Sequence, residues 1–136
     1  MIELWDYLHG VDRNEMQLWA EREKLGVRER AQLNQKLDMV AVIGFDTAWQ
    51  LKFLAGTSGN YNHIYKLVVK SQRMLRPMLC RGPRDMRAEV TLLCGAIEKD
   101  FELHPPGAAS QADKYRLQLE TDLKLGHNRR VEHERF

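Results

Sequence analysis

The sequence predicts an α+β fold: a small antiparallel sheet with two N-terminal helices packed on one face and a C-terminal helix. Three observations predict it. Apolar residues recur at helical spacing over residues 15–42, short strand-like apolar runs with short connections fill residues 64–94, and a second helical pattern follows the Pro-Pro-Gly stretch at 105–107. Short connections favour antiparallel neighbours, and 136 residues, 43% of them hydrophobic, fit one domain with one core.

The first strand and the first helix are predicted at the N-terminus. Residues 2–8 alternate loosely between apolar and polar, as a half-buried strand does. Asp12 and Glu15 have the spacing of a capping box, in which each side chain bonds a backbone N–H of the other residue's region. A helix should follow to about Lys24, and Gly26 should end it.

A longer second helix is expected over residues 27–42, because its apolar positions recur every three or four residues. Gly44 stands where a helix C-cap would be. Residues 45–50 (FDTAWQ) are interpreted as a linking stretch. The turn-rich segment 55–62 (AGTSGNYN) is interpreted as a hairpin-like loop.

Three strands are predicted next, at residues 64–69, 74–80 and 89–94, and their short connections favour an antiparallel meander. Pro77 lies inside the middle strand and has no N–H to donate. That strand must therefore be bulged at Pro77 or exposed along one side.

A C-terminal helix is predicted over residues 108–124, with an apolar face at three- and four-residue spacing. Residues 1–125 then form a single domain, and residues 126–136 form a short basic tail. Two alternatives remain for this tail from the sequence alone: a mobile terminus, or a segment that docks through Phe136.

Positive charge is concentrated in residues 63–87, although the whole chain carries a formal net charge of only +2. This segment holds one acid and seven basic residues: Lys66, Lys70, Arg73, Arg76, Arg81, Arg84 and Arg87. Strand alternation puts Lys66, Lys70 and Arg76 on a common solvent-facing surface. Concentrated cation suggests RNA as a partner, and the alternative is a solvated sheet face that keeps the protein soluble.

Other features of the sequence limit the location and the chemistry. The N-terminus lacks the basic region of a signal peptide, and no apolar run approaches membrane-spanning length, so a cytoplasmic location without membrane contact is expected. Cys80 and Cys94 are interpreted as reduced apolar residues on strands. No metal-binding or phosphate-loop motif occurs, so no metal and no cofactor is expected.

Four local patterns, in order, resemble the RelE/HigB-type toxin superfamily, most of all its phage-derived HigB-like branch. An opening strand precedes a helix pair that ends at Gly44. The other three matches are LKFLAGTSGNYNHIYKLVV (51–69), RMLRPMLC (73–80) and VTLLCGAIEKDFELHPPGAASQADKYRLQL (90–119). The resemblance covers residues 2–123, and the order and spacing of the patterns carry it, because no single motif is specific.

The resemblance implies a RelE-like fold and the toxin of a type II toxin-antitoxin system, encoded on a prophage. Such toxins are ribosome-dependent mRNA endonucleases, or mRNA interferases. They cut without a metal, by attack of the 2′-hydroxyl on the neighbouring phosphate. The expected partners are the ribosome with its mRNA and a cognate antitoxin, often of the helix-turn-helix type. The alternative is a non-catalytic prophage protein on the same fold that binds RNA or a host protein.

The site residues follow from the resemblance together with the chemistry of phosphate. Arg76 and Lys99 match basic residues of the family's patterns, and His104 lies at a sheet-to-helix junction where an acid or base could stand at the rim. These three are the candidate catalytic residues. The candidate RNA-binding residues are Lys66, Lys70, Arg73, Arg81 and Arg84. The general base and acid stay open, since each histidine alone is more often a surface residue than a catalyst.

Three positions depart from the family's pattern. Val68 replaces an arginine, Ala96 replaces a phenylalanine and Glu98 replaces a lysine. These losses bear on catalysis more than on the fold. If Arg76 faces solvent beside the scissile phosphate, Arg76→Glu should abolish growth inhibition and leave the fold intact.

Overall fold

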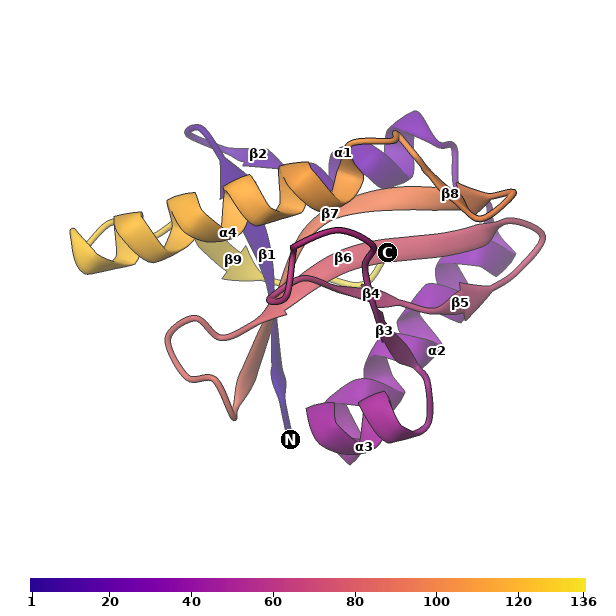
Figure 1. Cartoon of the computed structure of the whole chain (residues 1–136), viewed down its shortest axis with the longest axis horizontal. Helices are drawn as coiled ribbons and strands as arrows, with labels where there is room; N and C mark the ends of the chain where they lie inside the picture. The colour runs from indigo at the N-terminus through magenta and orange to yellow at the C-terminus, as the bar shows by residue number, and fades with distance from the viewer.

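The computed structural model describes all residues, 1–136, and shows a twisted sheet with helices on both faces (Figure 1). The strands are β1 (Glu3–His9), β2 (Arg13–Asn14), β3 (Leu54–Gly56), β4 (Tyr65–Leu67), β5 (Val69–Lys70), β6 (Met74–Arg81), β7 (Glu89–Lys99), β8 (Glu102–His104) and β9 (Arg130–Glu132). The helices are α1 (Glu15–Arg22), α2 (Val27–Ile43), α3 (Phe45–Gln50) and α4 (Ala108–Lys124). The predicted α+β class is confirmed.

The sheet is mixed, whereas the sequence predicts an antiparallel one. Its order is β2-β1-β7-β6-β4-β3, and the predicted meander of β4, β6 and β7 is antiparallel. β1 instead runs parallel to β7. The chain leaves β1 through the helices and returns to the sheet much later, and such a long crossover permits a parallel pair.

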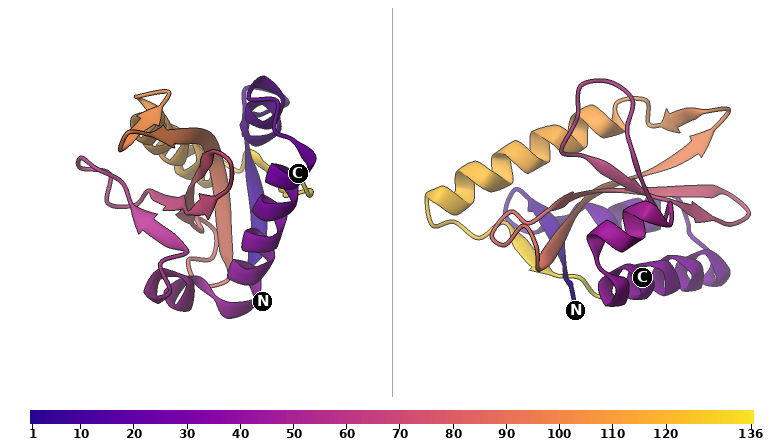
Figure 2. Two further views of the ribbon diagram at one scale, coloured as in Figure 1. Left: turned by 90° about the vertical axis from the view of Figure 1, so that its right-hand side faces the viewer. Right: turned by 60° about the horizontal axis from the view of Figure 1, so that its bottom comes forward.

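The two faces of the sheet are covered by different helices (Figure 2). One cluster of buried side chains joins α1, α2 and α3 to the sheet and includes Trp19, Leu33 and Leu79. The other joins α4 to the opposite face and includes Met78, Leu93 and Leu119. The C-terminal helix therefore does not share a face with the N-terminal pair.

The N-terminus of α1 is capped by Asn14, not by the predicted Asp12. The Asn14 Oδ1 accepts hydrogen bonds from the backbone N–H groups of Met16 and Gln17, both at 3.1 Å. The Asn14 side-chain amide also donates to the buried Asp6 carboxylate at 3.0 Å. This second bond fixes the cap to β1, which local spacing could not indicate.

Two elements were absent from the prediction. Residues 45–50, expected as a link, form α3, because Gly44 turns the chain (φ 89°) and Phe45 and Ala48 bury themselves one helical turn apart. The strand β8 returns along β7 after a tight turn in which Asp100 and Phe101 both have positive φ, 53° and 64°. This hairpin lacks the Asn-Gly or Asp-Gly signal that usually predicts one.

The expectation for Pro77 is confirmed. The register of β6 against β7 shifts between Met78 and Leu79, next to the proline. On the other side of β6, the partner strand is broken at Val68, whose N–H donates to the Phe53 carbonyl instead. The predicted strand 64–69 is therefore two short strands, β4 and β5.

The last eleven residues dock onto the domain and are not a loose terminus. β9 pairs with β1, and the His133 Nδ1 lies 2.8 Å from the buried Asp6 Oδ1. Phe136 packs edge-on against Trp19 and exchanges two hydrogen bonds with the Asn34 side chain. Of the two alternatives from the sequence, docking through Phe136 is the one observed.

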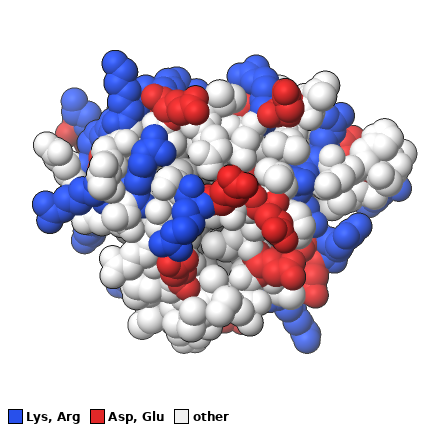
Figure 3. All heavy atoms as spheres, turned by 180° about the vertical axis from the view of Figure 1, so that it is seen from behind, with Lys and Arg blue, Asp and Glu red and all other residues white.

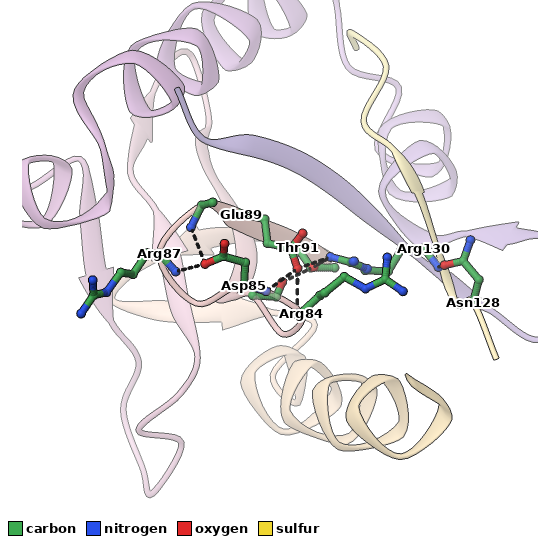
Figure 4. A network of polar contacts seen from close by, with 9 residues as sticks. Arg84, Asp85, Arg87, Glu89, Thr91, Asn128 and Arg130 are labelled. Carbon is green, nitrogen blue, oxygen red and sulfur yellow. Dashed lines mark hydrogen bonds and ion pairs between the residues drawn. The ribbon is translucent and has the colours of Figure 1, made fainter. Parts of the chain in front are cut away.

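A buried ion pair fastens this C-terminal segment to the sheet (Figure 4). The Arg130 Nη1 donates to the Glu89 Oε1 at 2.8 Å, and the two side chains are only 3% and 6% exposed. Glu89 also accepts the backbone N–H groups of Arg84 and Asp85, which shapes the loop between β6 and β7. The Arg130 guanidinium lies over the Trp5 ring, 4.6 Å from its centroid.

No helix of the chain combines the length and the apolar character that crossing a membrane requires. Cys80 and Cys94 are buried and unbridged, as expected for apolar strand residues. Burial raises the pKa of each thiol to about 12, so neither is a ready thiolate near neutral pH.

Gly95 lets α1 approach the sheet, and Gly95→Ala should therefore be strongly destabilising. A Cβ there would lie 2.0 Å from the Trp19 ring, and Trp19 is fully buried. Overpacking a core of this kind costs about 1–3 kcal/mol or more. Urea unfolding measures the change, and Gly56→Ala is the control because its Cβ would meet only Trp49 at 3.9 Å. Equal stability of the two variants would contradict this account of the helix contact.

Candidate nucleic-acid interface

The basic residues of segment 63–87 do not form one exposed patch. Acids from other segments pair with most of them: Glu98 with Lys66 and Arg76, Glu29 and Glu23 with Arg73, and Asp46 with Arg81. On the face that carries α1 and α2, acidic and basic side chains are interspersed (Figure 3). The predicted common surface of Lys66, Lys70 and Arg76 is therefore wrong, because charge balance in the sequence segment is not charge balance in space.

Lys66 and Arg76 converge on one carboxylate. The Lys66 Nζ lies 2.6 Å from the Glu98 Oε1, and the Arg76 Nη2 lies 3.3 Å from the Glu98 Oε2. The hydrogen bond from Lys66 lowers the pKa of Glu98, and the Arg76 charge lowers it further. Glu98 therefore stays ionised and neutralises one of the two cations.

Arg76 is buried, contrary to the prediction that it faces solvent. Its side chain is 7% exposed, and its Nη1 donates to the Leu75 carbonyl at 3.0 Å and to the Val69 carbonyl at 3.5 Å. These bonds lie across the break between β4 and β5, where the backbone lacks its ladder partner. Arg76 thus serves the sheet, and its guanidinium has little surface left for a phosphate.

Arg76→Glu should consequently unfold the protein, not merely inactivate it. The substitution places two carboxylates together in a buried site and removes the donors to two carbonyls. Breaking a buried pair in this way costs about 3–5 kcal/mol. Urea unfolding checks this, with Lys70→Glu as the control at an exposed position without an ion pair. A variant with wild-type stability would restore the solvent-facing role.

Arg73 and Arg81 also have structural contacts. Arg73 forms a two-pronged pair with Glu29, from Nε at 2.9 Å and from Nη2 at 2.8 Å, and these hydrogen bonds lower the pKa of Glu29. Arg81 lies over the Phe45 ring, 4.3 Å from its centroid, and donates to the Met86 carbonyl. Lys70 and Arg84 are exposed, at the end of β5 and in the loop after β6.

Lys99 and His104 come together in a cleft of about 570 Å³, which we call the basic cleft. Its lining residues are Arg22, Glu23, Arg73, Ile97, Lys99, His104 and Pro105. Four of these seven side chains carry or can carry positive charge, against one acid. The basic cleft therefore unites three residues predicted for the site, Arg73, Lys99 and His104.

The basic cleft is built from two elements far apart in sequence. The β7–β8 hairpin supplies Lys99 and His104, and Ile97 pairs with His104 across it. The last turn of α1 supplies Arg22, which follows the buried Trp19 by three residues. Arg22 and Lys99 are exposed and have no carboxylate within ion-pair distance, so both cations are available to a ligand.

The chemistry of the basic cleft suits a phosphodiester. Arginine and lysine at the rim can meet phosphate oxygens, and a histidine beside them can take or give a proton. The remaining acid, Glu23, already lies 3.4 Å from Arg73. A polyanion entering the cleft therefore meets a positive surface.

A second cleft of about 550 Å³ lies across the hairpin, against the N-terminal end of α4. It contains Lys66 but also Glu98 and Glu102, so its charge is close to balanced. Two aromatic residues also line it, Tyr61 and the fully exposed Phe101. This cleft offers stacking surfaces but no free cation to compare with those of the basic cleft.

Sequence reasoning missed Arg22 and the role of Glu98. Nothing in the local pattern of α1 distinguishes Arg22 from an ordinary residue of a helix end. Glu98 was noted only as a departure from the family's lysine. Its alternation with Ala96 along β7, and the pairing of Met74 with Glu98, put it beside Arg76. Only the register between strands reveals that neighbour.

Searches of family models, curated proteins and solved structures gave no match to this chain.

Proposed function

We propose that this protein is an endoribonuclease that binds RNA in the basic cleft and cuts it by attack of a 2′-hydroxyl on the adjacent phosphate. The observation that carries the proposal is that Lys99 and His104 line one cleft with Arg22 and Arg73. These residue types supply what the reaction needs: cations for the charge that builds at phosphorus, and a group that moves a proton.

The proposed step balances as an internal transfer. The 2′-oxygen loses its proton to a base and forms a bond to phosphorus, while the bond from phosphorus to the 5′-oxygen breaks and that oxygen takes a proton. The products are a 2′,3′-cyclic phosphate and a 5′-hydroxyl end. His104 is the proton-transferring group of the proposal, and Lys99 and Arg22 steady the phosphate. Arg76 becomes a positioning residue, because it holds Glu98 and the broken strand edge.

The resemblance to RelE/HigB-type toxins supplies the rest of the proposal. It makes ribosome-bound mRNA the substrate and an antitoxin protein the inhibitor. Growth should then stop when the chain is expressed alone. The cytoplasm, where translation takes place, is the corresponding proposed location.

The alternative is a non-catalytic protein that binds RNA or a host protein. The ion pairs of Glu98 favour it, since they occupy Lys66 and Arg76, two cations that the endonuclease reading assigned to RNA. Brief induction followed by mapping of RNA ends separates the two functions. An endonuclease leaves new 5′-hydroxyl ends within messages, whereas a binder leaves the message ends unchanged.

A further inference from the structure

A large groove lies between α2 and the segment from α3 to β3, and the proposed activity does not use it. Its volume is about 1080 Å³. Residues of α2 form one wall, residues 49–56 form the other, and Val68–Lys70 contribute from β5. It shares no lining residue with the basic cleft. We call it the lysine groove.

Apolar side chains stand open to solvent in the lysine groove. Met39 is 38% exposed, Trp49 46% and Leu51 55%. These three side chains come from separate elements and line the same hollow with Phe53 and Val68. Apolar surface gathered in a concavity is typical of a binding site, whereas single exposed apolar residues are ordinary.

The charge of the lysine groove has one sign only. Lys36, Lys52 and Lys70 line it, and no aspartate or glutamate does. None of the three lysines has an ion-pair partner, in contrast to Lys66, Arg73 and Arg76 in the adjoining strands. Lys36 instead lies over the Phe53 ring, with Nζ 4.0 Å from the centroid, so its charge sits directly at the apolar floor.

We propose that the lysine groove binds an acidic peptide segment with apolar side chains, carried by a partner protein. The apolar side chains would cover Met39, Trp49 and Leu51, and the carboxylates would meet the three lysines. RNA fits this surface less well. The groove has no arginine to meet phosphate with two donors, and the aliphatic Met39 and Leu51 offer nothing for a base to stack on. The proposal does not depend on the nuclease activity.

A selection from a random peptide library displayed on phage, with the full-length chain as bait, tests the proposal. Enriched peptides should carry net negative charge together with apolar residues. Synthetic copies should change the fluorescence of Trp49, the one tryptophan that is largely exposed, since Trp19 is fully buried and Trp5 half-buried. Failure to enrich such peptides, or enrichment of basic ones, overturns the proposal.

Variants locate the peptide. The triple variant Lys36→Glu, Lys52→Glu, Lys70→Glu should weaken peptide binding at least tenfold, and Leu51→Ser should weaken it without a change of charge. The matched control carries Lys24→Glu and Lys114→Glu, both exposed and outside the groove, and should bind as the wild type does. Peptide binding that survives the triple variant, or a groove that takes single-stranded RNA in place of the peptides, overturns the assignment. Circular dichroism confirms that each variant is folded.

Discussion

Arg130→Met should lower the free energy of unfolding by about 3–5 kcal/mol, because it leaves the buried Glu89 without its cation. Methionine keeps much of the apolar stem but offers no donor. Glu89 would retain only the two backbone N–H groups of the loop at 84–85. The contact between the Arg130 guanidinium and Trp5 is lost as well.

Arg135→Met is the matched control for Arg130→Met, six residues apart on the same segment. Arg135 pairs with Asp38 at 3.1 Å, but both side chains are more than half exposed. Exposed pairs contribute little to stability. Urea unfolding of both variants should therefore show a large loss for Arg130 and almost none for Arg135. Similar small losses would mean that the C-terminal segment does not hold the domain together.

His104→Ala should slow the appearance of new RNA ends by about 10²–10⁴-fold, the range expected for loss of a proton-transferring group. His104 is exposed at the rim of the basic cleft, so the fold should be unaffected. His63→Ala is the control, since His63 is also exposed but lies outside this cleft. Sequencing of 5′-hydroxyl ends at intervals after induction gives the rates. Unchanged rates for His104→Ala would remove this residue from the proposed chemistry.

The sequence predicted the elements with strong periodic patterns. The bounds expected for the second helix and for the C-terminal helix agree with α2 and α4 within about two residues, because amphipathic spacing and glycine at the ends are local signals. Pro77 also gave a correct prediction, since a missing N–H must be accommodated wherever the strand lies.

The errors share one cause: each depends on contacts between distant segments. Arg76 alternates like a solvent-facing strand residue, yet Glu98 and the interrupted edge of β5 bury it. The short segment 45–50 becomes a helix because Phe45 finds a core to enter. The acid partners of the basic segment, Glu29 among them, come from helices or strands that the local count could not include.

The basic cleft was predictable only in part. Lys99 and His104 lie five residues apart, and the strand pairing that turns them toward α1 follows from a hairpin without its usual turn residues. Arg22 joins them through the placement of α1 against β7, which Gly95 and Trp19 determine. A sequence pattern within either segment holds no trace of the other.

The most direct test of the central claim is a count of new 5′-hydroxyl ends in cellular RNA after induction of Lys99→Glu, beside the wild type and Lys114→Glu. Both lysines are exposed, but only Lys99 lines the basic cleft. We expect abundant new ends from the wild type and from Lys114→Glu, and ends at the uninduced level from Lys99→Glu. Equal numbers of ends from all three, or none from the wild type, would contradict RNA cleavage in the basic cleft.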